Sequence, residues 1–273
     1  LPLGVAGWLA AASRRAPFVF NIQDVFPDVA VELGAITNPR VIAAASWLER
    51  FLYRRADAVT VLSEDLRDNV AGKLRGRRPE RVEVIPNFVD TERIAPAERE
   101  NSYRAEYGLS GRTVVMYAGN VGLSQSLDLV VDAARRHRDR EDLVFVINGG
   151  GSALDGLRES AADLDNLRFV PMQPRERLAE VLAAGDLHLV PLRTGLARSS
   201  VPSKLYSILA AGRPVLASVD ADTEVATTIE RAGAGVSVLP EDPDAFCAAL
   251  DGLLADPDRL DEMGAAGRRF VEG

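Results

Sequence analysis

The sequence predicts an α/β protein with two doubly wound parallel domains, of which the first is incomplete. Short apolar runs alternate with segments of helical periodicity in both halves of the chain. This periodicity fades between Asn87 and Ser110 and then restarts. The second half holds six predicted strands and the first half only three, so the first half resembles the tail of a similar domain.

The elements of the first half follow from local patterns. Strands are predicted at 18–22, 58–62 and 81–86, because each is a short run rich in Val, Ile or Phe. Residues 40–56 are predicted to form a helix with one apolar face, and Ser63 to cap the helix that follows. The apolar run 1–12 predicts an amphipathic helix, since it is too short to span a bilayer.

The second half shows the strand and helix alternation more fully. We predict domains at 1–90 and 111–273, joined by a linker at 91–110 with one short helix near 99–107. Predicted strands are 113–118, 143–148, 167–170, 187–191, 214–217 and 235–238, and predicted helices are 127–138, 153–162, 175–183, 202–211, 223–232 and 243–255.

Composition excludes some classes of function. The net charge of −8 argues against a nucleic-acid-binding protein. The single cysteine, Cys247, excludes an internal disulfide and lies in a helical pattern that predicts a buried, inert thiol. We therefore expect a reducing, cytoplasmic location.

Three loops are predicted to lie where α/β sheets bind ligands, beyond the carboxyl ends of the strands. They are 119–122, 148–152 and 193–203, and all are rich in small or polar residues. Glycines in such loops let a backbone approach a ligand closely, although ordinary turn geometry explains them equally well.

One residue in these loops conflicts with local electrostatics. The chain has two lysines, Lys73 and Lys204, and Pro202 is well placed to open a helix with Lys204 in its first turn. A cation there is unfavourable by a few tenths to about 1 kcal/mol. A phosphate bound at the helix start would explain the lysine, whereas a side chain extending into solvent is the alternative. The pattern favours a nucleotide or nucleotide-sugar site.

Two alternative functions have less support in the sequence. A dehydrogenase would show G-x-G-x-x-G after a strand, but the pattern that starts at Gly149 ends on Leu154. A metal-dependent transferase would use Asp220 and Asp222, yet the chain has four such pairs, and Asp222 serves equally as a helix cap. We therefore predict no metal site.

The two histidines are not predicted to be catalysts. His137 is expected to be solvated on a helix among arginines, and His188 to lie within a strand.

The motifs together resemble a known family, the retaining GT-B glycosyltransferases of family 4, and within it a polysaccharide-biosynthesis subgroup similar to fucosaminyltransferase-like proteins. The resemblance covers nearly the whole chain. It is carried by Gln23-Asp-Val-Phe-Pro-Asp28, Ala56-Asp-Ala-Val-Thr-Val-Leu-Ser63, Val84-Ile-Pro-Asn-Phe-Val-Asp90, Tyr117-Ala-Gly-Asn120, Val201-Pro-Ser-Lys-Leu-Tyr206 and Ala211-Gly-Arg-Pro-Val215.

The resemblance implies two Rossmann-like domains, with the acceptor on the first and the nucleotide-sugar donor on the second. It also implies that an N-terminal portion and a final helix of the family lie outside this chain. The implied donor-binding residues are Gly119, Asn120, Gln125, Gly149, Gly150, Ser199, Ser200, Ser203, Lys204 and Ser207, with base contacts from the backbone of Val170 and Met172.

This chain departs from the family at charged positions. Two family glutamates are Ser199 and Ser207 here, and a family Arg and Lys are Asn120 and Gln125. A His-Asp pair becomes Gln23-Asp24. Lys204 is left as the clearest diphosphate ligand, with Arg193 or Arg198 as a candidate second cation.

The implied activity is transfer of a sugar from a nucleotide diphosphate sugar, expected to be UDP-linked, to a saccharide or lipid-linked saccharide. Retention, no metal and no cofactor are implied, with Lys204 and Asp24 as the catalytic residues. A nucleotide-sugar 2-epimerase and a non-catalytic nucleotide-sugar-binding module remain alternatives.

A basic segment suggests a further partner. Its cations are Arg67, Lys73, Arg75, Arg77, Arg78 and Arg81. A solvated helix end explains them, because cations suit a helix C-terminus. The functional alternative is peripheral contact with an anionic membrane.

Overall fold

The computed structural model of the chain describes residues 1–74, 79–196 and 199–273. It divides into two compact units. The first comprises Leu1–Asn87 with Gly195–Val201, and the second comprises Phe88–Thr194 with Pro202–Gly273.

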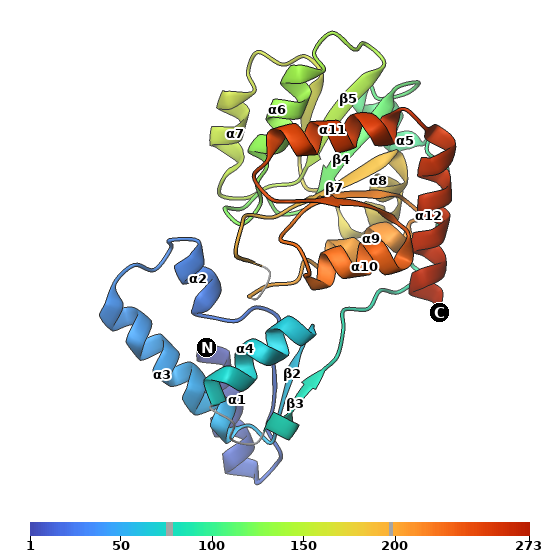
Figure 1. The fold of residues 1–273 in the computed structure, drawn as a ribbon. Coiled ribbons are helices and arrows are strands. Elements are labelled where there is room, and N and C mark those ends of the chain that lie inside the picture. Colours follow the sequence, from blue (N-terminus) through green and yellow to red (C-terminus); the bar gives the residue numbers. More distant parts are fainter. Residues whose placement is uncertain (75–78, 197–198) are drawn as a thin grey trace. The chain divides into compact units, whose positions relative to one another are not determined.

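The first unit is built on a small parallel sheet of order β1-β2-β3 (Figure 1). Its side chains form a core in which Val25, Leu66 and Val70 are fully buried. The Ser63 hydroxyl accepts a hydrogen bond from the Leu66 amide, which confirms the predicted cap. The elements are α1 (Pro2–Arg14), β1 (Val19–Asn21), α2 (Asp28–Glu32), α3 (Pro39–Arg55), β2 (Ala58–Val61), α4 (Glu64–Leu74), the 3₁₀ turn η1 (Pro79–Arg81) and β3 (Val82–Val84).

The second unit holds a parallel sheet of order β6-β5-β4-β7-β8-β9. The order reverses direction beside β4, which is where open α/β sheets bind ligands. The strands are β4 (Thr113–Ala118), β5 (Leu143–Asn148), β6 (Leu167–Val170), β7 (Leu187–Pro191), β8 (Val215–Ser218) and β9 (Gly235–Val238).

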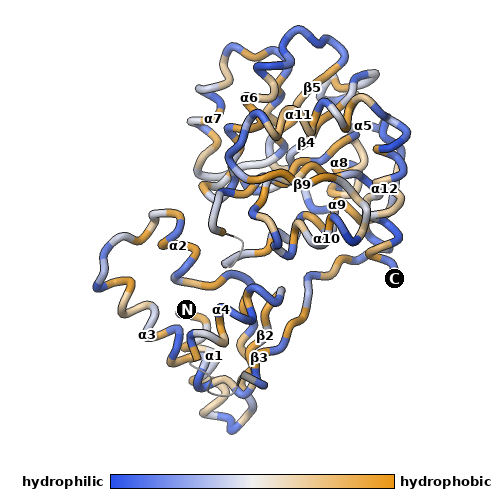
Figure 2. Tube along the Cα trace, viewed as in Figure 1, coloured by the Kyte–Doolittle hydropathy of each residue, from blue (hydrophilic) through white to orange (hydrophobic). Residues whose placement is uncertain are grey.

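Helices cover both faces of this sheet. On one face α6, α7 and α11 pack on alternate strand residues such as Phe145 and Leu189. On the other, α5, α8, α9 and α10 pack on the intervening residues, such as Val146 and Val190. In Figure 2 the tube through β9 is apolar. The helices are α5 (Ser102–Tyr107), α6 (Asp128–Arg136), α7 (Leu154–Ser160), the turn η2 (Arg175–Arg177), α8 (Leu178–Ala184), α9 (Lys204–Ala210), α10 (Glu224–Ala232), α11 (Pro243–Leu254) and α12 (Pro257–Glu272).

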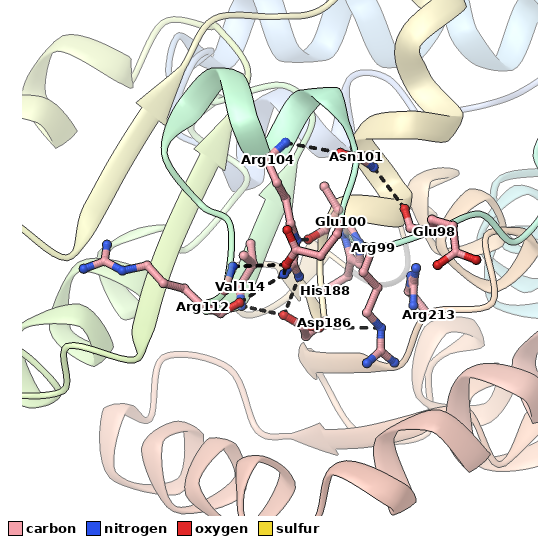
Figure 3. A network of polar contacts seen from close by, with 12 residues as sticks. Glu98, Arg99, Glu100, Asn101, Arg104, Arg112, Val114, Asp186, His188 and Arg213 are labelled. Carbon is pink, nitrogen blue, oxygen red and sulfur yellow. Dashed lines mark hydrogen bonds and ion pairs between the residues drawn. The ribbon is translucent and has the colours of Figure 1, made fainter.

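The segment expected to be a linker packs into the second unit (Figure 3). Arg104 is 3% exposed, and its guanidinium lies 2.6 Å from Asp186 Oδ2. The same carboxylate oxygen accepts the Val114 amide at 2.7 Å. Tyr103 is fully buried nearby. Buried charge pairing and apolar contact thus attach residues 88–110 to the start of β4 and β7.

Several local expectations were wrong. The helix expected from Pro202 begins at Lys204, so Lys204 is its first residue. Thr223, not Asp222, caps α10, with its hydroxyl accepting from the Ala226 amide. No helix was predicted after Ala255, yet α12 begins at Pro257 and packs on α9.

His137 is not solvated. Its Nδ1 lies 2.7 Å from the Ala133 carbonyl oxygen, and its Nε2 lies 2.7 Å from Asp251 Oδ1 on α11. The end of α6 packs against α11, so this side chain is buried between them. Cys247 is buried on α11 as predicted, and burial raises its pKa.

Candidate functional site

A cavity of about 320 Å³ lies in the second unit, at the carboxyl ends of β4 and β5. The loop after β6, together with η2, α8 and the start of α9, completes its wall. The lining residues are Ala118, Gly119, Asn148, Met172, Gln173, Pro174, Arg175, Leu178, Val181, Leu182, Ser203, Lys204 and Ser207.

The cavity lining combines an apolar wall with cationic groups. Met172, Leu178 and Leu182 supply apolar surface, and the two charged residues in the lining are Arg175 and Lys204. None of the 13 lining residues is acidic, although residues 88–273 contain 30 Asp and Glu against 20 Lys and Arg. A cationic hollow in an acidic unit favours an anionic ligand with an apolar part.

Lys204 lies over an aromatic ring. Its Nζ is 3.7 Å from the centroid of the Tyr117 ring, which is a cation–π contact. Across the part of the chain that the structure describes, Lys204 forms no ion pair, and burial lowers its pKa to about 7. The sequence conflict is thereby explained in part, because the π face compensates a cation that the helix dipole disfavours.

The two glycine loops lie beyond the strand ends, as the sequence suggested, and they pack on each other. A Cβ on Gly149 would lie 1.9 Å from the Gly119 carbonyl oxygen, and one on Gly151 would lie 2.2 Å from the Val121 carbonyl oxygen. The Val121 amide donates to the Gly150 carbonyl at 2.9 Å. Gly149 and Gly151 therefore allow the two loops to pack closely, whereas Gly119 lines the cavity.

Asn120 and Gln125 serve the loop after β4. The Asn120 carbonyl accepts the Tyr117 hydroxyl. Gln125 accepts from the Gly122 amide at 3.0 Å and donates to Ser124 at 2.8 Å. Neither residue is among the cavity lining. Their roles in donor binding stay a prediction.

The two residues expected to contact a base differ in position. Met172 lines the cavity and is 56% exposed, whereas Val170 is buried in β6. The Val170 carbonyl already accepts the Gly149 amide at 2.9 Å. Of this pair, Met172 lies where a base could reach it.

Ser203, Lys204 and Ser207 share the cavity, but Ser199 and Ser200 belong to the first unit. The Ser199 hydroxyl donates to Glu32 Oε2 at 2.6 Å, and Ser200 forms an antiparallel bridge with Asp24. The side chain of Asp24 is exposed.

Sequence reasoning missed Arg175 as a cavity residue. It is exposed on η2, and among the described residues its side chain has no hydrogen bond or ion pair. Arg193, one of the two candidates for a second cation, donates to the Leu123 carbonyl and pairs with Glu241. Arg198 lies outside the described residues. The available signal was its position, because Arg175 lies three residues after Met172, which was expected to contact the base.

His188 lies in β7 as predicted and is fully buried. Burial lowers its pKa to about 4, and its Nε2 lies 2.8 Å from the Leu182 carbonyl oxygen. Over 1–74, 79–196 and 199–273, no group of three or more His, Cys, Asp or Glu is arranged to hold a metal ion.

The predicted basic segment is partly occupied by internal contacts. Lys73 pairs with Asp28 and Glu49, and Arg81 donates to the Ala56 carbonyl. Arg67 pairs with Glu64. The other three arginines, at positions 75, 77 and 78, lie outside the described residues, so membrane contact stays a prediction. In the described residues no helix is both long and apolar enough to cross a bilayer.

The second unit is a doubly wound α/β domain with a cationic cavity at its strand ends, an arrangement typical of nucleotide-binding domains. Family models sharpen this. Residues 1–87 match the glycosyl transferase 4-like domain, and residues 112–256 match glycosyl transferases group 1. The chain belongs to the group 1 glycosyltransferase family.

Relatives of similar sequence are also named as glycosyltransferases. WcaI of Escherichia coli (strain K12), named a colanic acid biosynthesis glycosyl transferase, is 32% identical over 91% of this chain and 63% of its own length. A D-inositol 3-phosphate glycosyltransferase of Nocardia farcinica is 31% identical over 96% of this chain and 58% of its own. The chain thus spans about three fifths of these relatives.

Solved structures show the same fold. Anabaena Alr3699/HepE in complex with UDP-glucose has a TM-score of 0.77 over 98% of this chain and 71% of its own, at 16% identity. Sucrose-phosphate synthase from Thermosynechococcus elongatus has a TM-score of 0.74 at 19% identity. The GT-B fold expected from the resemblance is confirmed.

Proposed function

We propose that the complete protein transfers a sugar from a nucleoside diphosphate sugar, UDP-linked, to a saccharide or lipid-linked saccharide acceptor in cell-surface polysaccharide synthesis. The observation that carries this is the cavity with Lys204 and Arg175 and no acidic side chain in its lining. A diphosphate supplies the negative charge that this lining suits, and a base and ribose suit its apolar wall.

The chemistry that we propose for Lys204 is electrostatic. As the glycosyl bond loosens, negative charge grows on the leaving diphosphate, and a preorganised cation stabilises that charge. Arg175 is the second cation of the cavity lining. We infer retention from the family resemblance, and transfer without a metal from the capacity of these two cations to balance the diphosphate.

Asp24 is proposed to orient the acceptor. Its carboxylate is exposed, and its backbone is held by the bridge to Ser200. Support comes from its place in the Gln23-Asp24 pair, which matches a His-Asp pair of the family. The acceptor itself is proposed only by class.

Isothermal titration of the chain with UDP and GDP tests the binding half of this proposal. Micromolar binding of one nucleotide, lost in Lys204→Ala, is the expected result, and no binding of either contradicts it. For the transfer half, the complete protein is incubated with UDP-sugars and the products are followed by mass spectrometry. Binding without hydrolysis or transfer would favour the non-catalytic module, and a 2-epimer product would favour the epimerase.

A further inference from the structure

We propose that Tyr117 and Gly119 form a seat that holds the Lys204 ammonium at the cavity wall before any ligand binds, which makes Tyr117 a positioning residue. This inference rests on the nucleotide-binding role proposed above for the cavity. It assigns a purpose to the Tyr117-Ala-Gly-Asn120 motif, which the proposed chemistry does not use directly.

The ring side of the seat is rigid. Tyr117 is fully buried in the core that α6 and α11 form with the sheet, so its ring has little freedom to move. Its hydroxyl donates to the Asn120 carbonyl, which fixes the ring to the loop after β4. The Lys204 Nζ, 3.7 Å from the ring centroid, therefore has a defined place beside that loop.

The glycine side of the seat leaves room for the lysine. A Cβ on Gly119 would lie 2.9 Å from Lys204 Nζ and 3.2 Å from its Cε. Gly119 also has φ of +146°, which a residue with a side chain rarely adopts. The backbone conformation thus requires glycine here, and the missing side chain leaves the space that the Lys204 ammonium occupies.

A ring suits this purpose better than a carboxylate. The π face attracts the ammonium without forming a strong hydrogen bond to it, so its N–H groups stay available to a phosphate. His188 interacts electrostatically with Lys204, and its lowered pKa of about 4 keeps it neutral at pH 7, while Arg175 is the other charged residue of the cavity lining. No acidic residue of the lining competes with an incoming anion.

The chain offers a direct test without any ligand, because it contains only two lysines. With ¹³C-labelled lysine, the spectrum of the full chain shows two sets of methylene signals, which Lys73→Arg assigns. The seat predicts that the Lys204 ε-protons are shifted upfield by the Tyr117 ring current. Tyr117→Phe keeps this shift, whereas Tyr117→Leu abolishes it.

The same variants are then titrated with UDP. Tyr117→Leu is expected to weaken UDP binding about 3- to 30-fold, the range of a cation–π contact at a partly desolvated site, while Tyr117→Phe stays near the parent value. Phe145→Leu is the matched control, since it removes a fully buried ring from the same core cluster and leaves Lys204 untouched. It should bind UDP like the parent chain.

Three outcomes would overturn the seat. They are unshifted Lys204 ε-protons in the parent chain, an unchanged shift and affinity in Tyr117→Leu, and an equal loss of affinity in Phe145→Leu. If the parent chain shows the shift and binds neither UDP nor GDP, the seat stands and the proposed function of the cavity fails.

Discussion

The two lysines of this chain lie in opposite surroundings. In the first unit, Lys73 Nζ lies 2.8 Å from Asp28 Oδ1 and 2.7 Å from Glu49 Oε1. In the second unit, Lys204 Nζ faces an aromatic ring and a cavity whose lining holds no acidic residue. One ammonium is paired with carboxylates inside the protein, and the other is the one that we propose binds an anionic ligand.

The difference teaches how the surroundings of a lysine distinguish a structural cation from a candidate ligand-binding cation. Glu49 is 1% exposed, and burial raises its pKa, so it needs the nearby ammonium to stay ionised. Lys73 thus joins α2, α3 and α4 through Asp28 and Glu49. Lys204 joins no elements in this way, because it forms no ion pair among the described residues. Desolvation lowers its pKa to about 7.

The largest effect expected is on the folding of the first unit. Lys73→Met leaves the Glu49 carboxylate buried without its cation, which costs about 3 kcal/mol, the low end for a broken buried pair. The low end of that range applies because the Lys73 side chain is 17% exposed, so solvent partly screens the pair. Urea denaturation followed by circular dichroism measures the loss.

Arg67→Met is the matched control for Lys73→Met. Arg67 pairs with Glu64 at the surface, and its side chain is 43% exposed, so its loss should cost under about 1 kcal/mol. Equal destabilisation by the two variants would contradict a structural role specific to Lys73.

Lys204→Ala is expected to act on binding instead. Removal of one charge-assisted contact to a diphosphate weakens UDP binding by about 1.5–3 kcal/mol, or roughly 10- to 150-fold. The urea midpoint should not fall. An affinity within twofold of the parent chain would remove Lys204 from the site.

Much of the fold could be predicted from the sequence, because buried parallel strands are continuous apolar runs. The bounds of β4, β5, β6, β7 and β9 agree with the predicted ranges to the residue. Helix starts were less certain. Pro202 has the right φ for a first turn, but α9 begins two residues later, at Lys204. The N-cap of α10 is Thr223 and not the predicted Asp222, because both residue types suit an N-cap and they are adjacent in sequence.

Of the residues predicted for the site, Gly119, Met172 and three residues near the start of α9 line the cavity. Ser203, Lys204 and Ser207 share one helix start and one cavity. The contact of Lys204 with Tyr117 joins residues far apart in the chain, and no local pattern encodes it. Arg175 was missed for a different reason. Its neighbour Arg177 has the same chemistry but is bound to Glu106 and Glu180, so residue type does not distinguish the two arginines.

The smallest expected effect is a pH-dependent change in the free energy of unfolding when Lys204 is replaced. The pKa of Lys204 is about 7 in the folded chain and near 10.5 when unfolded, so the unfolded chain binds more protons between these values. The lysine therefore costs stability that is fully present below pH 7 and disappears as pH rises toward 10.5. Lys204→Met should raise the free energy of unfolding by about 1 kcal/mol at pH 6.5 and by less at pH 9. A larger gain at pH 9 than at pH 6.5 would contradict this sign.

The central proposal is that Lys204, which forms no ion pair within the described residues, is the cation that binds the diphosphate. Calorimetric titration of the chain with UDP from pH 6.5 to 9.5 tests it most directly. Because the bound form keeps its proton while the free lysine has a pKa of about 7, the affinity should fall by up to about tenfold per pH unit above pH 7. Lys204→Ala should bind weakly, with no such slope. A parent affinity that is constant from pH 6.5 to 9.5, or the same slope in Lys204→Ala, would contradict the account.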